Sequence, residues 1–456
     1  MFIFQFLGEK KKITIINLMA YLPNTIFLFV LIFGIGFFIK NIRRIFHNIN
    51  LGKKIKRNDQ SSIRFKRMLK IAFGQTKIVS RPISGILHLI VYVGFILINI
   101  ELLEIILDGL IGTHRIFAPY LGSFYNFMIA SFEILAFLVL VSVILFWSRR
   151  NIIKIKRFWM PEMKGWPKKD ADNILYFEII LMILFLAMNT TDSLLQQAEV
   201  ATYIKAGSFP ISQFFTPLFY GFSIDSLIIF ERTFWWLHII GILIFLNYLY
   251  YSKHLHILLA FPNVYYSNLE KKGKFDVNHN IKNEVKMMLF PEKFIEEEKS
   301  EIINKFGVSD IFDLNRMQLM NAYSCTECGR CSEVCPASQT GKKLSPRSIM
   351  MKTRDRLEEV SNNILTNKGS FKNDGKELLN DYISTEELWA CTTCNACVEA
   401  CPIEIDPLSI IMDMRQYLIL EKSAAPQELN TMMTNIENNG APWPFNNQDR
   451  LQWIDE

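Results

Sequence analysis

The sequence predicts an all-α protein in which a five-helix transmembrane bundle precedes a helical domain that carries the cysteines. Half of the 456 residues are hydrophobic and only 21% are charged, and the long apolar runs all lie before residue 262. All eight cysteines lie after residue 324. This distribution excludes a small secreted disulfide scaffold, a disordered chain and a purely soluble enzyme.

The transmembrane bundle is predicted for residues 1–261, because a spanning helix needs about 20 consecutive apolar residues. Five stretches meet this condition, at approximately 18–39, 82–107, 124–147, 174–191 and 233–251. The first stretch is too long for the apolar core of a signal peptide and lacks a small-residue cleavage site. We therefore expect it to be retained as a membrane span.

The loops between these stretches differ sharply in charge. Segments 40–81 and 148–173 are rich in Lys and Arg, whereas 108–123 and 192–231 are nearly free of both. The positive-inside rule then places both basic loops in the cytoplasm, the N-terminus outside and everything after residue 252 inside. Lys10, Lys11 and Lys12 would lie outside, against this rule, but the larger positive charge of segment 40–81 outweighs theirs. We interpret the basic residues as topology signals and lipid-headgroup contacts, and find no pattern typical of nucleic-acid binding.

The cysteines form two copies of one motif. The first is CTECGRCSEVCP, with Cys325, Cys328, Cys331 and Cys335, and the second is CTTCNACVEACP, with Cys391, Cys394, Cys397 and Cys401. This spacing is typical of proteins with two [4Fe–4S] clusters, in which the fourth Cys of each run ligates the other cluster. We therefore expect one cluster on Cys325, Cys328, Cys331 and Cys401, and the other on Cys391, Cys394, Cys397 and Cys335.

Zinc and disulfides are the alternatives for these cysteines. A zinc site uses only two pairs of ligands, which leaves eight thiols with two Cys-Pro endings unexplained. Disulfides are disfavoured because the motifs are predicted to face the reducing cytoplasm.

The region around the motifs has helical patterns at 345–365, 381–388 and 407–420. Residues 310–422 resemble the helical ferredoxin domain of the iron–sulfur subunits of heterodisulfide reductase, anaerobic glycerol-3-phosphate dehydrogenase and succinate dehydrogenase. We call this region the ferredoxin domain, with a cytoplasmic tether at 262–309 and a tail at 423–456. In longer members of that superfamily a Cys-rich (CCG-type) catalytic domain follows. Since no further Cys occurs before Glu456, the resemblance implies that substrate chemistry belongs to a partner chain, with no catalytic residue here.

Histidines in the predicted bundle suggest haem. His238 and His256 are 18 residues apart, which is five helical turns, so a continuous helix would carry them on one face about 27 Å apart. We expect His88 and His256 to ligate one haem near the inner face, and His238 and His114 to ligate an outer one. His254 is an alternative ligand. Interfacial or hydrogen-bonded helix contacts are the simpler explanation for all of them.

The bundle resembles the nitrate reductase gamma-subunit family of quinol-oxidising cytochromes b, on its five spans, its outside N-terminus and the paired His of the fifth span. The family's second His on span two is missing, since Ile98 and Asn99 stand there. The resemblance implies one or two haem b groups and quinone as substrate. Glu101, Glu104 and Glu133 are candidates to accept quinol protons or to bond neighbouring helices.

These features predict an electron-transfer subunit of an oxidoreductase complex in the cytoplasmic membrane, with its partners on the cytoplasmic side. It would relay electrons in either direction between quinone and a soluble or peripheral partner, through haem and two clusters. The alternative is a haem-free membrane anchor that carries a ferredoxin relay. No glycine fingerprint or nucleophile motif indicates nicotinamide, flavin or ATP binding.

Overall fold

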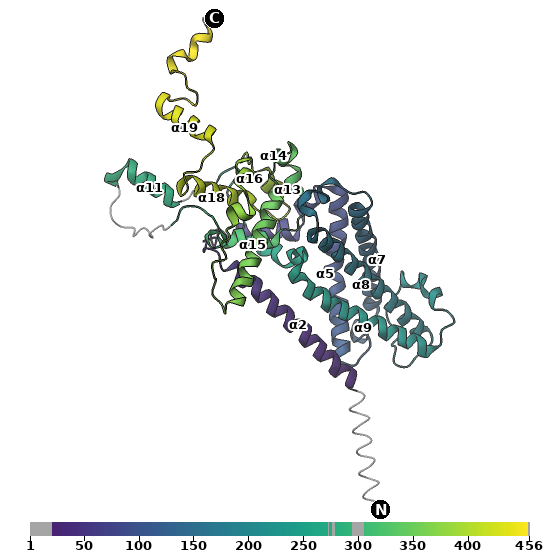
Figure 1. The fold of residues 1–456 in the computed structure, drawn as a ribbon. Helices are drawn as coiled ribbons and strands as arrows, with labels where there is room; N and C mark the ends of the chain where they lie inside the picture. The colour runs from purple at the N-terminus through teal and green to yellow at the C-terminus, as the bar shows by residue number, and fades with distance from the viewer. Residues whose placement is uncertain (1–20, 272, 276–278, 294–304, 455–456) are drawn as a thin grey trace, which may run out of the picture.

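The computed structural model describes residues 21–271, 273–275, 279–293 and 305–454. Within these residues the chain forms helices and turns, with only two isolated β-bridges, Lys53–Asn315 and Leu379–Ile383. The all-α prediction is therefore confirmed. The long helices gather at one end of the molecule and the cysteine-bearing helices at the other (Figure 1).

Five helices are long and apolar enough to cross a membrane. They are α2 (Leu22–Ile49), α5 (Pro82–Ile111), α7 (Ser123–Asn151), α8 (Trp166–Gln197) and α9 (Ile224–Tyr248), the last prolonged by a turn, η6 (Leu249–Tyr251). Each overlaps one predicted span, and the fourth and fifth begin earlier than predicted. Residues 18–20 of the first predicted span and Lys10, Lys11 and Lys12 lie outside the described residues.

Helices α5, α7, α8 and α9 pack as a bundle, and α2 leans on α5 and α9 (Figure 1). Phe27 of α2 is fully buried and packs on Trp235 of α9, with ring centres 5.2 Å apart. Trp235 is only 7% exposed. The reason is that α2 covers this face of α9.

The short elements connect and extend the bundle. Around it lie α3 (Ser61–Met68), η1 (Leu69–Phe73), α4 (Thr76–Val79), α6 (Ala118–Leu121), η2 (Lys156–Phe158), η3 (Pro161–Met163), η4 (Ser212–Phe214), η5 (Thr216–Phe219), η7 (Lys253–Leu255), α10 (His256–Tyr265), α11 (His279–Leu289) and η8 (Pro291–Lys293). The tether predicted at 262–309 thus starts inside α10, and residues 272, 276–278 and 294–304 of it lie outside the described part.

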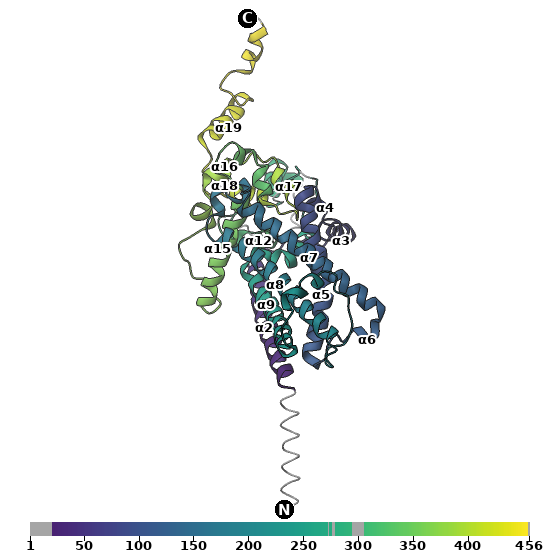
Figure 2. The same cartoon turned by 90° about the vertical axis from the view of Figure 1, so that its right-hand side faces the viewer.

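The ferredoxin domain is built of short helices around one long helix. Its elements are η9 (Ile311–Asp313), α12 (Arg316–Ser324), α13 (Arg330–Glu333), α14 (Pro336–Gln339), α15 (Pro346–Thr366), η10 (Leu378–Tyr382), α16 (Thr385–Trp389), α17 (Ala396–Ala400) and α18 (Pro407–Leu420). The predicted helices at 345–365 and 407–420 match α15 and α18. The one at 381–388 is instead a kinked turn and a new helix, because Asn380 has φ +76° and the Ser384 side chain caps α16. Beyond the domain, α19 (Gln427–Asn439) and η11 (Asn447–Ile454) extend away from the molecule (Figures 1 and 2).

One hydrophobic core joins the ferredoxin domain to the end of the bundle that carries the two basic loops. We call this the inner end, and the opposite end the outer end. It includes Ile45 of α2, Ile71 of η1 and Leu259 of α10 together with Leu319 and Ile349 of the ferredoxin domain. Helix α10 therefore packs against α12. Both views show the ferredoxin domain lying against the inner end of the bundle (Figures 1 and 2).

Ion pairs reinforce this contact. Arg67 donates two hydrogen bonds to Glu404, at 2.7 and 2.6 Å, and Arg81 donates one to Glu333 at 2.6 Å. These arginines belong to the basic loop that we interpreted as a lipid-headgroup contact. The structure corrects that interpretation for them, because their side chains bind carboxylates of the ferredoxin domain.

Gly307 makes a close contact that any side chain would disrupt. Its φ is +75°, and a Cβ there would collide with the backbone nitrogen of Tyr417 in α18. Both backbone strain and overpacking are destabilising. We expect Gly307→Ala to lower the free energy of unfolding by about 2–4 kcal/mol, measured by thermal unfolding in detergent.

Gly369 is the matched control for this substitution. Its φ is +95°, but no atom lies within 4 Å of a Cβ built there. Gly369→Ala therefore introduces backbone strain without overpacking. It should lower the free energy of unfolding by about 1 kcal/mol. Equal losses for the two variants would contradict the packing described at Gly307.

Candidate functional site

The eight cysteines occupy two neighbouring groups at the inner end of the bundle. All eight thiols are free. Cys325, Cys328 and Cys331 of the first motif line one cavity together with Cys401 of the second. Cys397 also lines this cavity. On the other side, Cys335 lies within electrostatic reach of Cys391 and Cys397. Cys401 thus lies with the first three cysteines of the first motif, and Cys335 lies near the first and third cysteines of the second.

Local backbone geometry shapes these loops. Gly329 has φ +74°, and a Cβ there would come within 2.5 Å of Arg347 Nη1. Pro336 begins α14 directly after Cys335, because proline suits the first turn of a helix. Backbone N–H groups point at sulfur: Ile405 N lies 3.3 Å from Cys401 Sγ and Thr393 N lies 3.5 Å from Cys391 Sγ. Such donors favour the thiolate form that binds iron.

The thiol groups are not arranged around a single ion. Among the described residues, no three His, Cys, Asp or Glu side chains converge as ligands of one metal ion do. With Zn–S bonds of about 2.3 Å, a zinc ion would draw its thiolates to within about 4 Å of one another. A cube of four irons needs four thiolates spaced more widely, and Cys325, Cys328, Cys331 and Cys401 supply four around one cavity.

A buried charge network adjoins the first cysteine loop. Glu327 lies between Cys325 and Cys328 and accepts a hydrogen bond from Arg354 at 2.6 Å. Lys253 of the membrane bundle pairs with the other oxygen of the same carboxylate. Burial disfavours the charged form, but the two cations outweigh it and hold the pKa of Glu327 below its usual value.

The first pair of predicted haem ligands is brought together. The rings of His88 on α5 and His256 at the start of α10 have centres 6.5 Å apart and planes 48° apart. Both line an apolar cavity of about 340 Å³, which His254 also lines. Burial lowers the pKa of His254 and of His256, so both imidazoles are neutral at pH 7.

The route by which His256 reaches this cavity differs from the prediction. A continuous helix from His238 to His256 was assumed, but α9 ends at Tyr248 and two short turns precede α10. His256 faces His88 because the chain bends there, and not because the two His share a helical face. The Nδ1 of His256 lies 3.2 Å from the carbonyl oxygen of Lys253, which fixes the ring.

The second predicted pair is not brought together. His238 lines its own apolar cavity, where Ile98 and Asn99 of α5 also lie. His114 lines a different cavity, near the outer end of the bundle. There its Nε2 lies 3.1 Å from Asp192 Oδ1, and its Nδ1 accepts a hydrogen bond from Ile204 N at 3.2 Å. These partners account for both ring nitrogens of His114.

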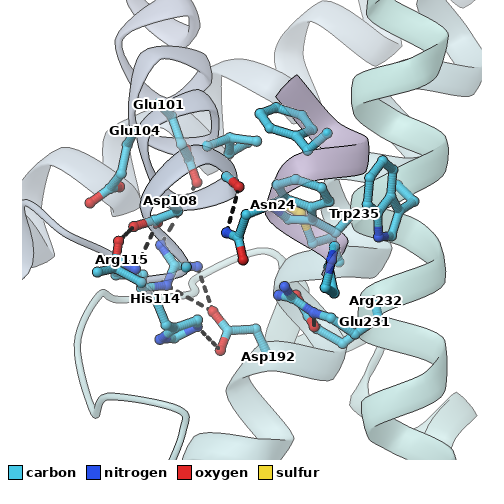
Figure 3. Close-up of a pocket in the computed structure, with 18 residues that line it drawn as sticks. Asn24, Glu101, Glu104, Asp108, His114, Arg115, Asp192, Glu231, Arg232 and Trp235 are labelled. Atoms are coloured by element: carbon cyan, nitrogen blue, oxygen red, sulfur yellow. Dashed lines mark hydrogen bonds and ion pairs between the residues drawn. The ribbon is translucent and has the colours of Figure 1, made fainter. Parts of the chain in front are cut away.

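The outer cavity is the most highly charged part of the bundle (Figure 3). It has a volume of about 270 Å³ and is lined by the aromatic side chains of Phe27, Trp235 and Trp236 and by the acids and bases labelled in Figure 3. Arg115 and His114 both converge on Asp192, and the Arg115 Nη2–Asp192 Oδ2 distance is 2.7 Å. Glu101 lies 3.8 Å from Arg115.

The three acids that we singled out have distinct environments. Glu104 accepts hydrogen bonds from Tyr125 OH at 2.7 Å and Phe117 N at 2.8 Å. Glu133 is fully buried away from the outer cavity and accepts hydrogen bonds from the backbone N–H groups of Ile211 and Ser212. Glu133 therefore anchors the outer loop, whereas Glu101 and Glu104 line the cavity.

The cavities adjoin one another from the outer end of the bundle to the cysteines. Ile105 lines both the outer cavity and that of His238. Glu178 lines both the His238 cavity and the His88–His256 cavity. Ile403, two residues after Cys401, lines both the His88–His256 cavity and the cysteine cavity. Sequence reasoning did not find this series, because no local pattern marks which apolar side chains two cavities share.

Comparison with known proteins agrees with the cysteine motifs. Residues 324–405 match the 4Fe-4S dicluster domain family. The chain is 29% identical to a probable iron-sulfur-binding oxidoreductase, FadF, of Bacillus subtilis, over 94% of this chain and 60% of that protein. It is 27% identical to the EtfAB:quinone oxidoreductase of Syntrophomonas wolfei, over 88% of this chain and 55% of that protein. No solved structure matches the chain.

The ferredoxin domain has relatives of its own. A protein of Archaeoglobus profundus, named for its likeness to a heterodisulfide reductase subunit, is 26% identical over 28% of this chain and 50% of that protein. The predicted relation to heterodisulfide reductase subunits is thus confirmed, and the dicluster domain with its eight cysteines accounts for two [4Fe–4S] clusters. The chain spans little more than half the length of the two long relatives. The resemblance to the nitrate reductase gamma subunit stays a prediction.

Asp192 compensates the charge of buried Arg115, which gives a stability prediction. Asp192→Asn leaves the guanidinium with Glu101 as its nearest carboxylate, 3.8 Å away. Removing one partner of a buried pair costs about 3–5 kcal/mol, so we expect a clear fall in the unfolding temperature in detergent. Asp225→Asn, at an exposed position in the first turn of α9, is the control and should change it little. Equal stability of both variants would contradict the proposed pairing.

Proposed function

We propose that this chain relays electrons between membrane quinone and a cytoplasmic protein partner, through two [4Fe–4S] clusters held beneath the bilayer. The names of the two long relatives, an iron-sulfur-binding oxidoreductase and an EtfAB:quinone oxidoreductase, support this assignment. The basic loops on the ferredoxin side of the bundle support its cytoplasmic orientation. The chain contributes ligands, burial and spacing, with no covalent catalysis by its side chains.

The position of Ile403 is the observation that carries this proposal. One side chain lies against both the cysteine cavity and the cavity of the buried histidines. A relay needs its redox groups close together inside protein that excludes water. The series of adjoining cavities meets that need from the outer end of the bundle to the cysteines.

The crossed arrangement of the two motifs supports our proposal for the cluster ligands. We assign Cys325, Cys328, Cys331 and Cys401 to the cluster nearer the bundle, and Cys391, Cys394, Cys397 and Cys335 to the other. When bound, the clusters supply one-electron oxidation and reduction. Cys394 is exposed, so the second cluster is the one that a soluble partner can approach. That partner would be an EtfAB-like protein or a CCG-domain subunit.

His88 and His256 are proposed as axial ligands of one haem b. A metal–imidazole bond is about 2 Å and the ring centre lies about 1 Å behind the nitrogen, so shared ligation places two ring centres about 6 Å apart. The observed 6.5 Å fits this, and the cavity around the rings is apolar. His238 would hold a second haem only with a partner other than His114, since the structure places those two His in different cavities.

The outer cavity is the proposed quinone site. Its aromatic wall suits a quinone ring, and Glu101 and Glu104 lie where protons of a quinol would leave toward the outer side. Among the described residues no second His lines the His238 cavity, so an outer haem has no ligand pair there. The alternative for the whole chain is a haem-free membrane anchor with a ferredoxin relay.

Metal content and ligand variants test the cluster assignment. Anaerobically purified protein should contain about eight iron and eight acid-labile sulfide per chain. Cys401→Ala should perturb the same electron paramagnetic resonance (EPR) signal as Cys328→Ala, whereas Cys335→Ala should perturb the signal that responds to Cys394→Ala. Uncrossed pairing of these signals, or zinc in place of iron, would refute the assignment.

A reduced-minus-oxidised optical spectrum tests haem. The proposal predicts a sharp α-band of b-type cytochrome that is lost in both His88→Ala and His256→Ala. His47→Ala, at an exposed position on α2, should leave the band unchanged. Broad iron–sulfur absorption without any α-band in wild-type protein would establish the haem-free anchor instead.

A further inference from the structure

Lys253 makes an unusual contact between the membrane bundle and the first cysteine loop. Its side chain is only 8% exposed, and its Nζ donates to the carbonyl oxygen of Pro167 at 2.6 Å. The same Nζ pairs with Glu327 and lies 3.8 Å from Asp170 of α8. Lys253 is also close in sequence to His256, which faces the histidine cavity. One buried ammonium therefore connects the segment that carries His256 to a carboxylate of the ferredoxin domain.

Glu327 is the carboxylate closest in sequence to the thiols of this loop, between Cys325 and Cys328. Its side chain is 2% exposed, and its residue has φ +55°, which few non-glycine residues adopt. Its carboxylate lies within electrostatic reach of the Cys325 sulfur, two residues away in sequence. Arg354 holds the second carboxylate oxygen at 2.6 Å. A charge so placed acts on the cluster with little screening by solvent.

We propose that Lys253 and Glu327 form a redox-tuning pair, through which the membrane bundle sets the reduction potential of the cluster on Cys325. This proposal rests on the ligand assignment made above. Reduction adds an electron to the cluster, so the Glu327 carboxylate disfavours it and the Lys253 ammonium favours it. Because Lys253 belongs to the bundle, the potential of this cluster depends on how the ferredoxin domain is seated.

The pair differs from the other ion pairs of the interface in its burial. Glu333 lies in the same motif and binds Arg81 and Arg157 of the membrane bundle, at 2.6 and 3.1 Å. Its side chain is 45% exposed, however, so solvent screens its charge. Glu333 thus provides a carboxylate of equal charge, in the same cysteine motif and with the same type of partner, but without the burial.

The test is a potentiometric EPR titration of the full chain in detergent. We expect Glu327→Gln to raise the potential of one cluster, with about a tenfold change in its reduced-to-oxidised ratio at fixed ambient potential, which is about 59 mV for a one-electron couple. Lys253→Met should change the ratio in the opposite direction. Lys253→Arg keeps the positive charge and should leave the ratio at its wild-type value. The potential of the cluster perturbed by Cys394→Ser should stay unchanged in all three variants.

Glu333→Gln is the control and should change the ratio less than about threefold, as a screened surface charge does. Shifts of equal size for Glu333→Gln and Glu327→Gln, or unchanged potentials in both Glu327→Gln and Lys253→Met with full iron content, would overturn the proposal. If Glu327→Gln loses iron, the potentials of the two Lys253 variants test the proposal, because these variants leave the cysteine loop intact. Wild-type protein without about eight iron atoms would instead refute the ligand assignment itself.

Discussion

The structure depends on the direct packing of the cysteine loops against the inner ends of the apolar helices. An electron leaves an apolar bundle only where a second redox group lies close to the first, in protein that excludes water. A shared hydrophobic core, in which Leu259 of α10 and Leu319 of α12 take part, holds the ferredoxin domain against the bundle, as the proposed relay requires. Paired charges surround the core and fix how the two parts fit together.

These charges have a physical cost that explains their arrangement. A buried ion pair gains little net stability, because both groups lose their water, but an unmatched partner is strongly destabilising. Lys253 with Glu327 and Arg67 with Glu404 thus act mainly against misplacement, since any other seating of the ferredoxin domain would leave a buried charge alone. Besides the topology role predicted from the sequence, the basic loops therefore form the docking surface for acidic side chains of the ferredoxin domain.

Much of this architecture follows from patterns that are local in sequence. Apolar length predicted the five long helices, and cysteine spacing predicted the dicluster domain. The proximity of His88 and His256 was also expected, although the continuous helix assumed between His238 and His256 is wrong, since α9 ends at Tyr248. Contacts distant in sequence were not predictable: nothing local indicates that Lys253 meets Glu327, that His114 binds Asp192, or that Ile403 lies between two cavities.

The most direct test of the whole account is electron transfer between the clusters and membrane quinone in a single chain. The clusters of the chain in lipid nanodiscs would be reduced chemically under anaerobic conditions, and an oxidised quinone would then be added while the visible absorbance and EPR signals are followed. We predict that both clusters are reoxidised and that quinol appears in proportion, one for every two electrons. Clusters that stay reduced in the presence of excess quinone would contradict the account.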